Sequence, residues 1–209
     1  MSAIAPHAVT VRLATSDDDA QVHSLFHGLH AFNATLDSRF SLADDWPAVL
    51  ADHLTHERLH HHGATYLAWL GERAVGLLMM DGHTDSPLFL DRHWAELIAL
   101  YVVPDQRGEG VADDLLDEGM AWAQDHGYTR IQLYVTTSNM GAKRFYGRSR
   151  FKPIQEIWCY DLPQASGLPS TDLACESAYA HGHNLLSNTR HHLTADDEPC
   201  KEDETTQYT

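Results

Sequence analysis

A glycine-containing turn at residues 106–112 separates two segments that are rich in apolar side chains. Gly108 and Gly110 carry no Cβ, so the backbone of the turn can approach a ligand closely. At the start of a helix, unpaired N–H groups and the positive end of the helix dipole point toward one place. A turn followed by a helix is therefore an anion site, and we expect a phosphate-bearing ligand there.

The segments beside this turn have the patterns of a strand and a helix. The apolar run at residues 97–103 ends at Pro104, which is typical of a buried strand. After the turn, a helix that ends at Gly127 is predicted. Its buried face consists of apolar residues at helical spacing, namely Val111, Leu115, Leu116, Met120 and Ala123. A second strand at residues 131–135 then leads into a shorter helix over residues 139–146.

Three motifs in this βαβα order resemble the GNAT superfamily of N-acetyltransferases. The R-x-x-G-x-A pattern at residues 107–112 is similar to the acyl-CoA loop of that family. The strand end at residues 100–104 and the N-x-x-A-x-x-x-Y pattern at residues 139–146 lie at the expected distances from it. The resemblance covers residues 9–162 and is specific over residues 96–151.

This resemblance implies a mixed α/β fold of the GNAT type, in which a mostly antiparallel sheet is flanked by helices and a splayed pair of strands holds acyl-CoA. It also implies an N-acetyltransferase that moves an acetyl group from acetyl-CoA to a primary amine of a small molecule or protein, through a tetrahedral intermediate. The cofactor-binding residues that it indicates are Leu100, Tyr101, Val102, Arg107, Gly108, Glu109, Gly110, Val111, Ala112, Asn139, Ala142 and Lys143. Asn139 has an alternative role as the N-cap of the second helix.

Tyr146 is the expected general acid. A phenol with a pKa of about 10 can protonate a departing thiolate, whose conjugate acid has a pKa of about 8.5. The alternative is that Tyr146 is an aromatic core residue beside Phe145.

The general base is less clearly marked. Several family members carry a glutamate at the position of Ile98, and Glu96 is the nearest carboxylate on the same face of the strand. Glu96 is therefore the expected base, acting through water, and its alternative is a solvent-exposed strand end. Asp81, His83 and His93, expected on a neighbouring loop, are further candidates, and histidine has the better-matched pKa.

The acceptor is expected where the first helix pair meets the central strand. His30, Asn33 and Asp37 are the expected substrate-binding residues, with Arg39 and Phe40 beside them. An anionic Asp37 would favour an amine, whereas Arg39 would favour a carboxylate, so the nature of the acceptor stays open.

Charge and composition restrict the partners. The 209 residues include 14 basic and 30 acidic ones, a net charge of −16 with histidines neutral, which argues against nucleic acid as a partner. The acidic surface either attracts a cationic amine or only maintains solubility. One basic cluster contrasts with it and would suit the 3′-phosphate of coenzyme A, or is a solvated helix face: Lys143, Arg144, Arg148, Arg150 and Lys152.

Further features of the sequence predict the cellular compartment of the protein and whether it binds a metal. Residues 1–20 lack a secretory signal pattern, no apolar run is long enough to span a bilayer, and the three cysteines are isolated. These features predict a cytoplasmic protein that does not bind membranes. The histidine clusters at residues 56–62, 181–183 and 191–192 match no metal-ligand spacing, so we expect no metal.

The remaining elements complete one domain over residues 1–162. The patterns predict a strand at residues 9–13 and a helix through about residue 34, followed by a loop at residues 33–40. A second helix turns Trp46, Val49, Leu50 and Leu54 inward. A hairpin at residues 65–80, a polar connection at residues 81–94 and a last strand at residues 154–162 are also predicted.

Residues 163–209 form an acidic, histidine-containing tail that we expect to be partly disordered, with a helix at residues 172–186 as an option. Two alternatives to an enzyme stay open. Ile98 in place of the glutamate favours an acyl-CoA-binding regulator with weak or no catalysis, and the tail could be an acidic arm for a basic partner. A homodimer is also open.

Overall fold

The computed structural model describes residues 9–162, and the predicted tail lies outside them. Its sheet has five strands in the order β1-β2-β3-β4-β5. The strands are β1 (Thr10–Leu13), β2 (Gly63–Leu70), β3 (Arg73–Thr84), β4 (His93–Val102) and β5 (Ile131–Leu133). The helices are α1 (Asp19–Leu36), α2 (Trp46–His60), α3 (Val111–Asp125) and α4 (Met140–Arg148). Short 3-10 turns are η1 (Ser16–Asp18), η2 (Ser38–Phe40) and η3 (Pro104–Gln106).

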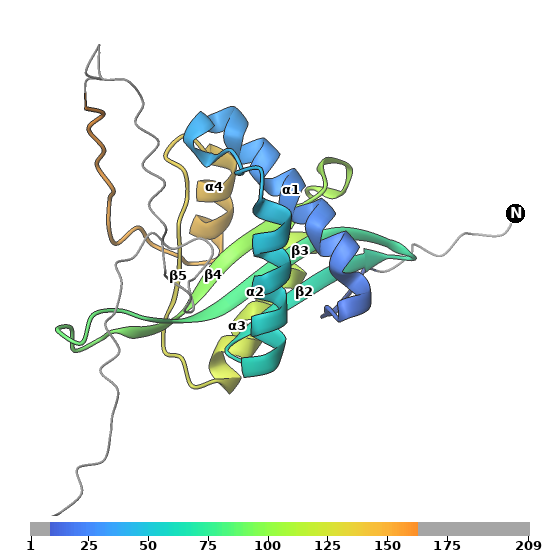
Figure 1. The fold of residues 1–209 in the computed structure, drawn as a ribbon, viewed down its shortest axis with the longest axis horizontal. Helices are drawn as coiled ribbons and strands as arrows, with labels where there is room; N and C mark the ends of the chain where they lie inside the picture. The colour runs from blue at the N-terminus through green and yellow to red at the C-terminus, as the bar shows by residue number, and fades with distance from the viewer. Residues whose placement is uncertain (1–8, 163–209) are drawn as a thin grey trace, which may run out of the picture.

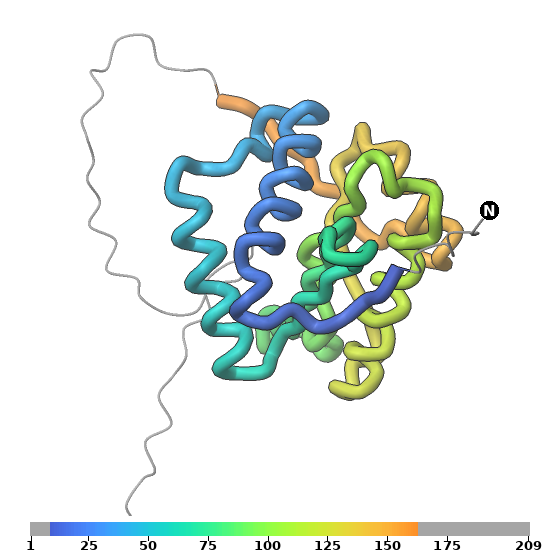
Figure 2. Tube along the Cα trace, turned by 90° about the vertical axis from the view of Figure 1, so that its right-hand side faces the viewer, coloured from blue at the N-terminus to red at the C-terminus, as the bar shows by residue number. Residues whose placement is uncertain are grey.

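The helices cover the two faces of this sheet in separate layers, as Figures 1 and 2 show. On one face, α1 and α2 pack through Val22, Phe26, Leu50 and Leu54 against apolar side chains of β2 and β3. On the other face, α3 packs through Leu115 and its neighbours, with residues of α4 at the margin. The predicted mixed α/β architecture is therefore confirmed.

The strands differ in how they are paired. β1 to β4 are antiparallel neighbours, and β5 joins β4 in parallel over only three residue pairs, from Ala95–Ile131 to Leu97–Leu133. A parallel pair requires a long crossover, and the segment with η3 and α3 provides it. Beyond Leu97, β4 continues alone on this side within the described part of the chain.

A β-bulge divides β4 at Ile98. Met80 pairs with Leu97 and Met79 pairs with Ala99, so Ile98 is the extra residue. Ile98 and Ala99 consequently both contact the layer of α1 and α2.

Three boundaries differ from the sequence prediction. The prediction of a polar connection over residues 81–94 is wrong at both ends, because β3 continues to Thr84 and β4 begins at His93. Asp81 and His83 are therefore buried strand residues rather than loop residues. The loop at residues 33–40 is also wrong, since α1 extends to Leu36 and η2 follows.

Two further corrections concern exposure and pairing. Val49 is 42% exposed, whereas Leu50 and Leu54 are buried, so the inward face of α2 is narrower than predicted. The prediction of a last strand at residues 154–162 is wrong. These residues pair with no strand of the described sheet, and Ile154, Trp158 and Tyr160 are exposed.

The end of α4 has a residue in the left-handed conformation that is not glycine. Arg150 has a φ of 70°, its N–H donates to the Gly147 carbonyl, and the N–H of Phe151 donates to the Tyr146 carbonyl. These two bonds form a Schellman motif, and the ring contact between Phe151 and Tyr146 is its usual apolar partner. A side chain with a Cβ is strained in this conformation.

We expect Arg150→Gly to stabilise the protein by about 0.5–1 kcal/mol, because glycine removes the left-handed strain. The melting temperature should rise by about 2 °C, as measured by thermal unfolding. Arg148→Gly is the matched control. Arg148 lies in the helix itself, so its replacement should lower stability by about 1 kcal/mol. Equal losses in both variants would contradict the assignment of strain to residue 150.

Candidate active site

The site lies where β4 and β5 diverge. Their pairing ends at Leu97 and Leu133, while β4 runs on to Val102. The predicted ligand-binding backbone at Leu100, Tyr101 and Val102 is thus on the unpaired part of the β4 edge, on the described side of the sheet. An extended ligand could hydrogen-bond there as an added strand does.

The glycine turn at the end of this opening is built for a close approach. Gly108 and Gly110 have φ values of 87° and 88°, and a Cβ placed on either would meet no other atom within 4 Å. The N–H groups of Gln106 and Arg107 donate to the carbonyls of Val103 and Pro104, and the next to bond back are those of Asp113 and Asp114, to the Gly110 carbonyl at 2.9 and 3.0 Å. Between them, the amides of residues 108–112 make no backbone hydrogen bond within the described part of the chain and are the candidates to bind an anion.

Arg107 fastens this turn to β4 and α1. Its Nε donates to the Val102 carbonyl at 3.0 Å, and its guanidinium lies 5.3 Å from the Phe32 ring centre and 5.7 Å from that of Tyr101. Tyr101 in turn packs so closely on α1 that a Cβ at Gly28 would lie 2.9 Å from its hydroxyl. Arg107 therefore holds the turn against β4 and α1. The Val102 carbonyl already accepts a hydrogen bond from Arg107.

Charges of both signs surround the turn. Glu109, Asp113 and Asp114 are exposed beside it and oppose an anion, so the attraction must come from backbone amides and from α4. The predicted basic residues of α4 are exposed, as expected for a solvated face or a phosphate contact. Lys143 donates from Nζ to the Thr137 carbonyl at 2.7 Å, which ties down the loop before α4.

Asn139 and Tyr146 are placed by α4. The Asn139 side chain accepts the N–H of Ala142 at 3.0 Å, so the N-cap role is present. Tyr146 is half-buried between the rings of Phe145 and Phe151, at centroid distances of 5.2 and 5.5 Å. Burial raises the pKa of Tyr146 above its usual value, so the phenol keeps its proton at neutral pH.

Glu96 lies deep in the structure rather than at a solvent-exposed strand end. It is 1% exposed, and its carboxylate is 3.2 Å from Nδ1 of His83, whose ring stacks on Trp94 at 4.3 Å. The alternative of a solvent-exposed Glu96 is therefore wrong. Glu96 and His83 are neighbours, whereas His93 is exposed and contacts the Thr84 hydroxyl.

The predicted acceptor residues lie along the last turns of α1 and directly after it, where the Asp37 N–H donates to the Asn33 carbonyl at 3.0 Å. Asp37 and Arg39 form an ion pair with a shortest distance of 2.8 Å, so neither charge stands alone. Asn33 lies on the last turn of α1. His30 has a buried Nε2 and lines a surface hollow with residues 41–44 and Trp46, while Gly28 of the same helix faces Tyr101. Burial lowers the pKa of His30.

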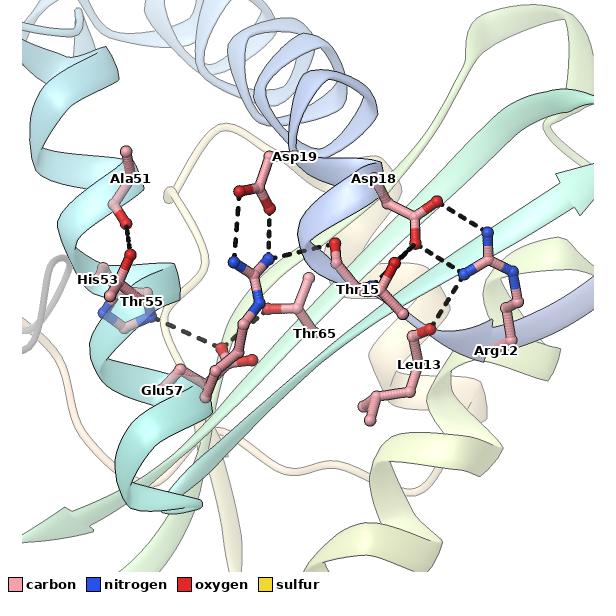
Figure 3. Close-up of polar contacts among 11 residues, drawn as sticks. Arg12, Leu13, Thr15, Asp18, Asp19, Ala51, His53, Thr55, Glu57 and Thr65 are labelled. Carbon is pink, nitrogen blue, oxygen red and sulfur yellow. Dashed lines mark hydrogen bonds and ion pairs between the residues drawn. The ribbon is translucent and has the colours of Figure 1, made fainter.

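Sequence reasoning did not single out Glu57. Its side chain lies under α2, accepts the Thr65 hydroxyl at 2.9 Å and has His53 at 3.9 Å, as Figure 3 shows. Burial raises the pKa of Glu57 to about 7. A carboxylate in a polar, histidine-rich helix gives no local sign that it will point inward, so only the packing of α2 reveals it.

Comparison with known proteins shows the family to which this geometry belongs. A model of the acetyltransferase (GNAT) family matches residues 29–151. The chain belongs to this family. The GNAT match spans the diverging strands, the glycine turn and α4 together, so the family resemblance of the sequence is confirmed.

Among curated GNAT relatives, N-acetyltransferase 8F1 of Rattus norvegicus is 30% identical over 115 residues, which are 52% of this chain and 51% of the rat protein. An uncharacterised N-acetyltransferase of Mycobacterium tuberculosis is 40% identical over 57 residues, or 27% of this chain and 36% of that protein. The chain thus spans about half or less of the length of these relatives.

Solved structures share the fold. An aminoglycoside acetyltransferase, AAC(6′)-Iy with a CoA-containing bisubstrate analogue, has a TM-score of 0.61 and 18% identity over 75% of this chain and 99% of its own. A transcriptional regulator from Bacillus halodurans has a TM-score of 0.57 and 23% identity over 74% of this chain and 100% of its own.

Two features are absent from residues 9–162. No helix among them has the length and apolar character to cross a membrane. No group of three or more histidine, cysteine or acidic residues within the same range is arranged to hold a metal ion.

Proposed function

We propose that this protein is an acetyl-CoA-dependent N-acetyltransferase that acts on a primary amine. The observation that carries the proposal is the combination of an unpaired β4 edge with a turn in which Gly108 and Gly110 leave open space before the start of α3. Such a space suits a diphosphate on backbone amides, and the edge suits the extended arm of coenzyme A.

When bound, acetyl-CoA supplies the activated acetyl carbon. A backbone N–H of residues 100–102 stabilises the charge that develops on the carbonyl oxygen. Glu96, with His83 beside it, takes a proton from the amine through water, because an alkyl ammonium cannot attack. Tyr146 gives its proton to the departing thiolate. Burial raises the pKa of Tyr146, so the phenol still carries this proton when the C–S bond breaks.

A second candidate, an acyl-CoA-binding regulator with little catalysis, is favoured by one observation. Ile98 stands on the bulge where several relatives carry the glutamate, and Glu96 is enclosed rather than open to solvent. Tight binding of acetyl-CoA without thiol release across a broad panel of amines would select this candidate.

The test of the proposed ligand is calorimetry with acetyl-CoA on the full chain and on Gly110→Ala. A residue with a Cβ is strained at a φ of 88°, so the turn should change shape and the affinity should fall about tenfold or more. Gly71→Ala is the matched control, because Gly71 has a φ of 61° and equally open space but lies in the β2–β3 turn. Equal affinities in the wild type and both variants would rule against the glycine turn as the diphosphate site.

A further inference from the structure

Three carboxylates lie buried at one end of the sheet, on the face that α2 covers. Glu57, Asp81 and Glu96 are 7%, 4% and 1% exposed and come from α2, β3 and β4. In each case the cationic group found within 4 Å is a histidine: His53, His62 and His83, respectively. Each of these carboxylates therefore has a histidine beside it, and Glu57 also accepts the Thr65 hydroxyl at 2.9 Å.

Asp81 stands next to Glu96. The two residues are directly opposite each other on β3 and β4, so their side chains leave the same face of the sheet about 5 Å apart. Burial, with contributions from the charges of Glu57 and Glu96, raises the pKa of Asp81 to about 7. At neutral pH a carboxyl of this kind both accepts and releases a proton.

His62 connects Asp81 with the surface. Its Nε2 is 3.4 Å from a carboxylate oxygen of Asp81, and its side chain is 36% exposed. The N–H of Gly82 donates to the His62 carbonyl at 2.8 Å and holds this residue against β3. On the outer side, the His62 ring is 5.3 Å from His56 and 6.3 Å from His60.

Gly63 allows this arrangement to be compact. It pairs with Asp81, and a Cβ there would lie 3.2 Å from Cγ of Glu57 and 3.4 Å from an oxygen of Asp81. It would also lie 2.8 Å from the carbonyl oxygen of Met80. A larger residue would therefore separate the carboxylates of α2 and β3.

We propose that Asp81 and His62 form a proton exit path from the Glu96–His83 pair to solvent. This role rests on the proposed acetyltransferase function, in which an ammonium acceptor loses two protons, one thiolate gains one, and one proton per turnover must leave. The proton moves from Glu96 to a carboxylate oxygen of Asp81, then to Nε2 of His62, and from that imidazole to bulk water. Asp81 and His62 touch no substrate and serve as relay residues.

Several titratable groups face Asp81 and can affect its protonation. These groups are Glu57 on α2, His62 before β2, His83 on β3, Glu96 on β4 and Tyr128 before β5. The pKa of Tyr128 is raised by burial and by the Asp81 charge. Tyr128 therefore remains protonated and takes no part in transfer at neutral pH.

The test compares proton release with thiol release in a single turnover of the full chain with acetyl-CoA and an accepted amine, in weak buffer. A pH indicator and a thiol reagent report the two events. In the wild type they coincide. In Asp81→Asn and His62→Gln, proton release should lag thiol release about tenfold or more, and added imidazole should restore it. Asp125→Asn, an exposed carboxylate on α3, is the control and should show no lag.

Two results separate the inference from the function on which it rests. Proton release that keeps pace with thiol release in both variants overturns the exit path alone. Acetyl-CoA binding without transfer to any amine in the wild type overturns the proposed function and the exit path with it.

Discussion

Replacing Tyr146 with phenylalanine is expected to lower kcat about 10²–10⁴-fold, the usual contribution of a positioned general acid. The phenol lies between Phe145 and Phe151, and phenylalanine fills the same space without a proton to donate. The affinity for acetyl-CoA should be unchanged, because the predicted ligand contacts of β4 and of the glycine turn remain. Steady-state kinetics with calorimetry on the same preparation would separate these two effects.

The matched control for this variant is Tyr128→Phe. Tyr128 is also half-buried, against Trp122, but it lies on the loop before β5. Its loss should leave kcat within about threefold of the wild type. Because burial raises the pKa of Tyr146, no loss of activity from its ionisation should occur below about pH 10. A Tyr146→Phe enzyme with wild-type turnover would assign the acid role to another group.

Glu96→Gln should produce the second large loss, about 10²–10³-fold in kcat/KM near neutral pH. The amide keeps the shape of the side chain next to His83 but cannot accept a proton. The deficit should shrink as the pH rises toward about 10, because the amine acceptor then loses its proton without help. The measurement is a pH profile of kcat/KM for both proteins.

Glu57→Gln is the control for Glu96→Gln, since Glu57 is a buried carboxylate of the same layer. Its oxygen accepts the Thr65 hydroxyl, which an amide oxygen can also do. We expect its kcat/KM near neutral pH to stay close to that of the wild type, and any change in its pH profile to be small and to follow from the loss of the Glu57 charge that raises the pKa of Asp81. If Glu96→Gln lowered activity equally at every pH, Glu96 would be a structural residue and His83 would become the base.

Local patterns were sufficient to predict the parts of this protein that are built from one segment. The glycine turn, the buried face of α3 and the N-cap at Asn139 each depend on residues within a few positions of one another. The hairpin of β2 and β3 was predicted for the same reason. The family resemblance then supplied the proposed role of Tyr146, which stays a prediction and which periodicity alone could not distinguish from that of a core aromatic.

Features that depend on distant contacts were mispredicted or missed. Asp81 and His83 have loop-like polarity, yet β2 and β4 on either side hold them inside a strand. The alternating residues at 154–162 have strand character, but a strand needs a partner in the sheet, which no residue pattern supplies. The inward-pointing Glu57 likewise depends on the packing of α2 against β2. The Asp37–Arg39 ion pair is a local contact, but no residue pattern indicates that these two side chains turn toward each other.

The single extra residue at position 98 makes β4 two pleats that are out of phase. In a regular strand Glu96 and Leu100 would face the same side of the sheet. The extra residue turns Leu100 to the side of α3, whereas Glu96 and Ile98 face the side of α1 and α2. Under the proposed function, the base and this part of the donor-binding strand therefore have their side chains on opposite faces of the sheet.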